Sequence, residues 1–213
     1  TGRWASIEAL KQGVDISMIT SACTARIMSN HLDEREKAWQ LIHSPAVGLS
    51  PDKESFAAMV REALYTGKII AYAQGFSLMQ DASRLYGWNL DLGKIASIFR
   101  AGCIIQAVFL NDITHAFEAE PKPENLIFDG FFLSRINEHQ DSLRQAVSTG
   151  VMNGLPIPAL CNAVSYLDEF RAKAAGANLI QAQRDCFGAH TYERTDREGV
   201  FHHEWRWAND NQH

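Results

Sequence analysis

The 213-residue sequence lacks paired cysteines, long apolar runs and an excess of charge. Its four cysteines, at positions 23, 103, 161 and 186, form no C-x-x-C pair, which argues against a zinc knuckle or a dithiol redox loop. No apolar run approaches the roughly 20 residues of a membrane span, and no signal peptide is apparent. We therefore expect buried, reduced thiols in a cytoplasmic protein without membrane contact.

The charge balance argues against two classes of partner, nucleic acids and anionic membranes. Twenty basic residues stand against 25 acidic residues, for a formal net charge of −5. Such a chain has no general attraction to polyphosphates or anionic membranes, so we expect no nucleic-acid partner, although a local basic site remains open. Because 46% of the residues are hydrophobic, the chain can bury a substantial core.

Several catalytic motifs are missing. No two glycines stand two residues apart, so a G-x-G-x-x-G turn for a dinucleotide cannot form. The Gly67-Lys68 and Gly93-Lys94 pairs lack the earlier glycine of a phosphate loop, and neither G-x-S-x-G nor H-E-x-x-H occurs. The histidines and cysteines are scattered, which favours no metal site. We assign no catalytic residue to this chain.

Apolar residues recur at intervals of three and four along most of the chain, which predicts an all-α fold. The clearest helix begins with Ser50 as its cap and Pro51 at its first position, and it ends at Gly87. About 35 residues at 1.5 Å each would give a central rod of roughly 50 Å. Gly67 and Gly75 within it suit close contacts with other helices.

The remaining helices follow from similar cues. Asp15 and Asp91 are predicted to cap two of them, and Asn178 with Gln181 resembles a capping box for a short helix that Gly188 closes. No linker or shift in composition marks a second domain. We expect one large helical domain, residues 1–200, and an extended tail, residues 201–213. The predicted helices cover residues 16–28, 92–100, 104–117, 128–151, 158–174 and 178–188.

The polar stretch 181–192 is the first candidate site. It places Arg184 late in a short helix and His190 just after the glycine stop, where both could reach an anion such as a carboxylate or phosphate. Alternatively, Arg184 pairs with Asp185 or another carboxylate, and His190 caps backbone carbonyls. Spacing leaves both interpretations open.

Arg26 is the second candidate, because it lies on a helical face that we expect to be buried. A buried arginine needs an anionic partner, from the protein or from a ligand. Arg100, which precedes Gly102, is a third candidate, although a salt bridge beside a helix cap explains it equally well. The tryptophans, such as Trp4 and Trp88, are interpreted as core or interface anchors rather than platforms for bases.

Several longer motifs make the sequence recognisable. They are Thr1-Gly2-Arg3-Trp4, Gly67-Lys68-Ile69-Ile70-Ala71-Tyr72-Ala73-Gln74-Gly75-Phe76, Phe99-Arg100-Ala101-Gly102-Cys103-Ile104-Ile105, Leu179-Ile180-Gln181-Ala182-Gln183-Arg184-Asp185, Phe187-Gly188-Ala189-His190-Thr191-Tyr192 and Phe201-His202-His203-Glu204-Trp205. With these motifs in this order, the chain resembles the C-terminal all-helical domain of the decarboxylating 6-phosphogluconate dehydrogenases almost from end to end.

The resemblance implies a role in an oxidoreductase that converts 6-phosphogluconate and NADP to ribulose 5-phosphate, carbon dioxide and NADPH in the pentose phosphate pathway. It implies that a Rossmann domain, absent from this chain, binds most of the NADP and, with the helix that follows, supplies the catalytic Lys, Glu and Asn. It assigns substrate binding here to Thr1, Arg26, Arg184 and His190. The last two would serve the neighbouring subunit's site, so the resemblance implies a homodimer.

Some positions depart from the family pattern. Arg3 stands where a lysine is usual, and because the positive charge is kept we expect little loss there. Gln106 replaces an arginine and Cys186 a tyrosine, which affects the expected affinity rather than the resemblance. Because Thr1 falls within a family motif, we expect the chain to be a fragment that is inactive alone. A free-standing, non-catalytic helical module that binds a sugar phosphate or dimerises is the alternative. The gene upstream of Thr1 would decide between them.

Overall fold

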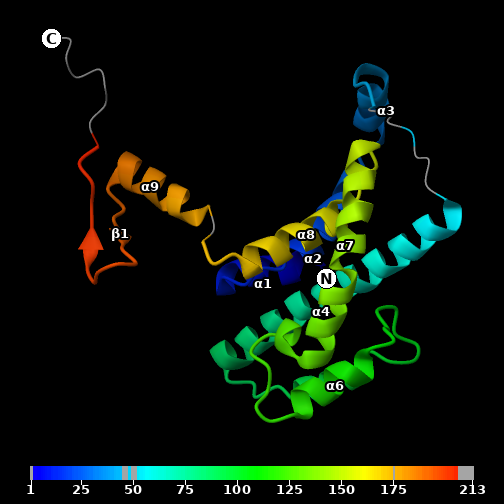
Figure 1. The fold of residues 1–213 in the computed structure, drawn as a ribbon, viewed down its shortest axis with the longest axis horizontal. Coiled ribbons are helices and arrows are strands. Elements are labelled where there is room, and N and C mark those ends of the chain that lie inside the picture. The colour runs from blue at the N-terminus through cyan, green and yellow to red at the C-terminus, as the bar shows by residue number, and fades with distance from the viewer. Residues whose placement is uncertain (1, 45–47, 49–51, 175, 206–213) are drawn as a thin grey trace. The chain divides into compact units, whose positions relative to one another are not determined.

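The computed structural model describes residues 2–44, 48, 52–174 and 176–205. Within this part of the chain the all-α prediction is confirmed, since helices are joined by loops and accompanied by one short two-stranded ribbon (Figure 1). Packing divides the chain into two compact units, residues 1–167 and 168–213. These units are defined by packing alone, so the predicted division after residue 200 stays a prediction.

The first unit contains most of the helices, including the long one. The elements of this unit are α1 (Gly2–Gln12), α2 (Ser17–Met28), α3 (Leu32–Leu41), α4 (Lys53–Tyr86), α5 (Leu92–Ile98), α6 (Leu110–Glu118), the 3-10 helix η1 (Leu126–Phe128), α7 (Gly130–Met152) and most of α8 (Pro158–Arg171). The second unit contains the end of α8, α9 (Ala177–Gly188), β1 (Tyr192–Glu193) and β2 (Val200–Phe201). None of the helices in the described residues is long and apolar enough to cross a membrane.

Helix α4 confirms the predicted central rod. Its 34 residues span about 50 Å at 1.5 Å per residue. The predicted cap at Ser50 is wrong, because Asp52 is the N-cap and accepts a hydrogen bond from the Ser55 amide at 2.9 Å. Ser50 itself lies outside the described residues. At the other end Gly87 adopts a φ of 65°, which confirms the predicted stop.

The core of the first unit forms where α7 crosses α4 (Figure 1). Phe109, at the start of α6, is almost fully buried there. Its ring meets those of Tyr65, Tyr72 and Phe132 edge to face, with centroids 5.5, 5.5 and 5.7 Å away. This geometry adds favourable ring interactions to the burial of apolar surface. One aromatic side chain therefore joins three helices.

Glycine permits one close crossing in this unit. A Cβ at Gly67 would lie 2.8 Å from Cδ2 of Leu160 on α8, which confirms the predicted close contact. At Gly75 the nearest atom, Cδ1 of Ile19, would be 3.9 Å away, an ordinary van der Waals distance. The predicted close contact is therefore confirmed at Gly67 and wrong at Gly75.

Several predicted boundaries need correction. The helix expected from residue 104 begins only at Leu110, because turns occupy the preceding segment and Ile104 is 99% exposed. Gly102, at a φ of 84°, keeps this segment out of helical geometry. Helices α1 and α3 were not predicted. In α3 no residue is buried, so its sequence carries only a weak apolar periodicity.

The second unit is built on α9, which confirms the predicted short helix. The predicted capping box is wrong, because Gly176 is the N-cap and makes no side-chain cap. Gln181 instead donates to the Thr191 carbonyl at 2.5 Å. Strands β1 and β2 pair antiparallel, with Tyr192 opposite Phe201. These strands were not predicted, since two residues are too few to show alternation.

Candidate functional site

Helix α2, which carries Arg26, is fixed to α4 at its first turn. The buried Gln74 of α4 accepts a hydrogen bond from the Met18 amide at 3.1 Å and donates to Ser17 Oγ at 3.2 Å. Asp15 accepts a hydrogen bond from the Ser17 amide at 2.7 Å, but the N-cap of α2 is Ile16, so the predicted cap at Asp15 is wrong. The contact of Gln74 with α2 was not predicted, although a glutamine on an otherwise apolar helical face was the available signal for it.

Arg26 lies near the other end of α2 and is exposed, so its predicted burial is wrong. Its Nη1 donates to Ser29 Oγ at 2.6 Å and to Asn30 Oδ1 at 2.7 Å. Both acceptors are neutral. They orient the guanidinium without cancelling its positive charge, which leaves that charge for an external anion.

Arg184 is exposed on α9, and its Nη1 donates to Gln181 Oε1 at 3.4 Å. Asp185 takes its hydrogen bonds from other groups, so the alternative of an Arg184–Asp185 pair is wrong. Helices α2 and α9 share one property. In both, a neutral oxygen three or four residues away accepts a hydrogen bond from the guanidinium of the candidate arginine.

His190 is exposed in the turn after α9. The residues on either side, Ala189 and Thr191, have φ values of 50° and 61°, in the left-handed region that costs free energy for residues other than glycine. A Cβ at Gly188 would lie 3.2 Å from the His190 ring, so the missing side chain lets the ring approach. The Ala189 amide caps the helix, whereas the alternative gave that role to His190.

Asp185 is the buried centre of the second unit. Its two oxygens interact at 2.8 to 3.0 Å with four nitrogens, namely the Thr191 and His203 amides, His202 Nδ1 and Trp205 Nε1. Burial by itself would raise the pKa of the carboxyl group. The hydrogen bonds from these donors outweigh burial and hold the pKa well below its ordinary value.

The predicted substrate residues therefore fall into two groups. Arg184 and His190 lie within one helix end and its turn in the second unit, whereas Arg26 belongs to the first unit. Thr1 lies outside the described residues. Arg100, the further candidate, lies in the exposed turn before α6, where its carbonyl accepts from the Cys103 amide at 2.9 Å.

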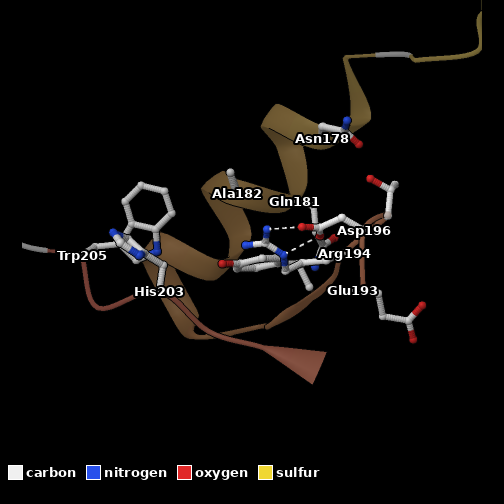
Figure 2. A pocket seen from close by; sticks show the side chains of 10 residues that line it. Asn178, Gln181, Ala182, Glu193, Arg194, Asp196, His203 and Trp205 are labelled. Atoms are coloured by element: carbon white, nitrogen blue, oxygen red, sulfur yellow. Dashed lines mark hydrogen bonds and ion pairs between the residues drawn. The ribbon is translucent and has the colours of Figure 1, made fainter. Parts of the chain in front are cut away.

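A pocket of about 500 Å³ lies between α9 and the β-ribbon (Figure 2). Arg26, Arg184 and His190 are not among its described lining residues. Arg194 is, but two of its nitrogens donate to the Asp196 carboxylate, at 2.7 and 2.6 Å. Because this ion pair neutralises the one arginine among the described lining residues, these residues are poorly suited to a phosphate.

A second hollow, of about 320 Å³, lies between α4 and α7. Arg61, Arg135 and His139 line it together with Glu62. Arg135 pairs with Glu138 at 2.7 Å, and His139 lies 3.8 Å from Glu62 and 3.7 Å from Glu138. These carboxylates offset the basic side chains, so this hollow offers an anion less net charge than its arginines suggest.

The described residues contain no group of three or more His, Cys, Asp and Glu side chains that could hold a metal ion. Their strands are β1 and β2, which pair with each other and do not lead through a glycine turn into a helix. These residues therefore do not fit the pyrophosphate of NADP in the usual way.

The thiols are less buried than predicted, and for two tryptophans the predicted interface role stays a prediction while a core role is wrong. The four cysteines are free, as expected, but half-buried rather than buried. Trp4 and Trp88 are 73% and 58% exposed, so neither anchors the core of this chain.

Comparisons with known proteins place these features in context. A family model described as "6-phosphogluconate dehydrogenase, C-terminal domain" matches residues 1–205. The chain is 48% identical over 205 residues to the decarboxylating 6-phosphogluconate dehydrogenase of Lactococcus lactis strain IL1403, covering 96% of this chain and 43% of the relative. It is 47% identical to that of Staphylococcus aureus strain N315, covering 96% and 44%.

A solved structure is also similar. It is that of Plasmodium falciparum 6-phosphogluconate dehydrogenase, described in its apo form, with its cofactor NADP+ and with its substrate 6-phosphogluconate. Its TM-score is 0.89 at 38% identity, and the match covers 95% of this chain and 44% of that one. The chain thus spans less than half the length of the relatives that it matches.

Proposed function

The chain belongs to the 6-phosphogluconate dehydrogenase C-terminal domain family, and from this premise we propose that it forms the substrate-binding and dimerisation part of a decarboxylating dehydrogenase. The reaction would oxidise 6-phosphogluconate with NADP and release carbon dioxide and ribulose 5-phosphate. Because the chain corresponds to 43% of the Lactococcus lactis relative, the proposal assigns the coenzyme site and the catalytic groups to a preceding domain.

The observation that carries this proposal is that two exposed arginines have neutral hydrogen-bond partners and no carboxylate partner in the described residues. Arg26 and Arg184 are exposed and bonded to neutral oxygens. In contrast, four other arginines pair with a nearby carboxylate, namely Arg84, Arg135, Arg171 and Arg194. A guanidinium that is oriented but not neutralised suits a phosphate, which accepts two parallel charge-assisted hydrogen bonds.

His190 and Thr1 complete the proposed clamp. His190 would donate one hydrogen bond to the substrate from a turn whose backbone is already constrained, which reduces the entropy lost on binding. Thr1, on the resemblance to the family loop, would contribute its hydroxyl. In this proposal the chain's residues bind and orient the substrate, and proton transfer takes place on the other domain.

The proposal includes a homodimer, in which Arg184 and His190 serve the partner's site. Exposed apolar side chains support an interface on the first unit. Trp4 and Leu10 of α1 and Trp39 of α3 are between 73% and 84% exposed. Where exposed apolar side chains form a contiguous patch, the patch marks an association surface. We further propose a cytoplasmic location, to which free cysteines are suited and which cell fractionation would test.

Subunit exchange tests the shared site. Full-length dimers with Arg184→Ala and dimers inactivated at the catalytic lysine of the preceding domain would each have little activity. Mixing them should restore activity, because one site of the heterodimer receives an intact lysine and an intact Arg184. A mixture that stays inactive after mass spectrometry confirms exchange would refute the shared site.

The 213-residue chain alone should not reduce NADP when given 6-phosphogluconate, and turnover above background would refute the assignment of catalysis elsewhere.

A further inference from the structure

The Asp185 carboxylate joins parts of the second unit that are distant in sequence. Oδ1 accepts a hydrogen bond from the Thr191 amide at 3.0 Å and lies 2.8 Å from His202 Nδ1. Oδ2 accepts from the His203 amide and from Trp205 Nε1, both at 3.0 Å. Each oxygen thus has two nitrogen partners, and the carboxylate holds the turn after α9 and the segment 202–205 against the helix.

The turn that carries His190 needs such support. Its neighbours Ala189 and Thr191 both adopt left-handed backbone conformations, which are unfavourable for these residue types. The Ala189 amide bonds to the main-chain carbonyl of Asp185 at 2.9 Å, and the Thr191 amide bonds to its side chain. Asp185 therefore stabilises the backbone on both sides of His190.

Asp185 also fixes the last turn of α9, where Arg184 lies. The helix places the two side chains in different environments, because the carboxylate is fully buried and the guanidinium is exposed. The buried negative charge is satisfied by its hydrogen-bond partners and does not pair with Arg184. The positive charge of Arg184 consequently stays available to a ligand although a carboxylate is adjacent in sequence.

We propose that Asp185 is a positioning residue of the substrate clamp, which holds Arg184 and His190 in their binding orientation without touching the substrate. This inference rests on the proposed function for the identity of the substrate. An ionised carboxylate is required at this position, because an asparagine side chain has a single accepting oxygen and its amide group would face two donors.

Hydrogen exchange tests the structural half of the proposal on the 213-residue chain itself. Asp185→Asn should lower the protection of the Thr191 and His203 amides and shift the Trp205 indole proton in NMR spectra, while amides in α4 keep their protection. Asp196→Asn is the matched control, since it makes the same chemical change at an exposed carboxylate of the same unit. Unchanged protection in Asp185→Asn would overturn the proposal.

Kinetics of the full-length protein test the functional half. Asp185→Asn should raise the KM for 6-phosphogluconate by up to about a hundredfold, because small displacements of binding groups have effects of this order. The KM for NADP should not change. Asp185→Asn should also raise the KM for 6-phosphogluconate by a smaller factor in a His190→Ala background, since both changes remove the same contact. A loss of protection with an unchanged KM for 6-phosphogluconate would leave Asp185 a purely structural role and overturn the proposal.

Arg26→Ala separates this inference from the proposed function. Arg26 bonds to Ser29 and Asn30 in the first unit, so its effect on the KM for 6-phosphogluconate does not pass through Asp185. If Arg26→Ala raises this KM and Asp185→Asn does not, the positioning role alone is wrong. If neither variant changes it, the proposed clamp is wrong and the positioning role fails with it.

Discussion

The two regions that carry the proposed clamp are supported in different ways. At the end of α2, Arg26 is oriented by Ser29 and Asn30, residues three and four positions further along the chain. At the end of α9, Arg184 has a similar local contact with Gln181, but the group that it forms with His190 also depends on a turn that a buried carboxylate ties to a segment about 17 to 20 residues away in sequence. Local contacts thus suffice for Arg26, whereas the group at the end of α9 also needs tertiary structure.

This difference has a physical reason. A side chain near a helix terminus finds acceptors in the next turn, so little chain entropy is lost to orient it. A left-handed turn with no glycine at its centre has no such local source of stability. It persists because hydrogen bonds to a buried charge offset its cost, and charge-assisted bonds are stronger than neutral ones.

The largest expected effect comes from removing either arginine. In the full-length protein, Arg26→Ala and Arg184→Ala should each weaken 6-phosphogluconate binding by about 2 to 4 kcal/mol, or roughly thirty- to a thousandfold, because each removes a charge-assisted contact with a phosphate. Coenzyme binding should change much less. Titration calorimetry with each ligand measures both. Arg171→Ala, which removes an exposed arginine paired with Asp168, is the control and should leave substrate binding unchanged.

The second prediction concerns the attachment of α2. Gln74→Met should lower the free energy of unfolding by about 1 to 3 kcal/mol, because the Met18 amide loses its buried acceptor. Urea unfolding measures the loss, and hydrogen exchange should locate it at the start of α2. Gln40→Met replaces an exposed glutamine that bonds to Glu36 and should be nearly neutral. Equal losses in both variants would contradict the role of Gln74.

A smaller effect is expected at the acceptors of Arg26. Ser29→Ala removes one neutral hydrogen bond that orients the guanidinium, so it should raise the KM for 6-phosphogluconate by a few-fold, or about 0.5 to 1.5 kcal/mol. Steady-state kinetics of the full-length protein check this. Ser97→Ala, at a half-buried serine of α5 that donates to the Lys94 carbonyl, is the control. An effect as large as that of Arg26→Ala would show that the local support matters as much as the charge.

The smallest expected effect is that of mild acid on the second region. The pKa of Asp185 lies below its ordinary value of 3.8, so its contribution to stability is complete above that value and is lost only as the pH falls further, through the lowered pKa of the folded protein. The protonation of Asp185 should therefore not change the chemical shift of the Trp205 indole proton between pH 7 and about pH 5. If that signal titrates between pH 7 and about pH 5 and Asp185→Asn abolishes the titration, the lowered pKa of Asp185 is contradicted.

The comparison also shows where sequence reasoning succeeds. Asp91 and Gly87 mark helix ends through local hydrogen bonding and backbone preference, and both act as predicted. The long apolar periodicity from Phe56 onward predicted α4, since burying one continuous face stabilises a helix strongly. The longer motifs, among them the one that contains Arg184, were sufficient to indicate the family that residues 1–205 match.

Errors arose where a neighbour distant in sequence decides the outcome. Arg26 was expected to be buried because the preceding residues are small and apolar, yet the last residues of α2 are exposed in the described part of the chain. Gln181 was assigned to a cap, but the turn after α9 brings the Thr191 carbonyl within reach of its amide. Ile104 was assigned to a helix although turns hold it in solvent.

The sequence by itself determined the helical class, the long central helix and the identities of the candidate substrate residues, because periodicity, caps and motifs are properties of short segments. Only the tertiary structure decided that Asp185 serves the turn and segment 202–205 rather than Arg184, and that Gln74 holds the start of α2. Buried polar groups must find partners, and which donors reach them depends on how distant segments pack together.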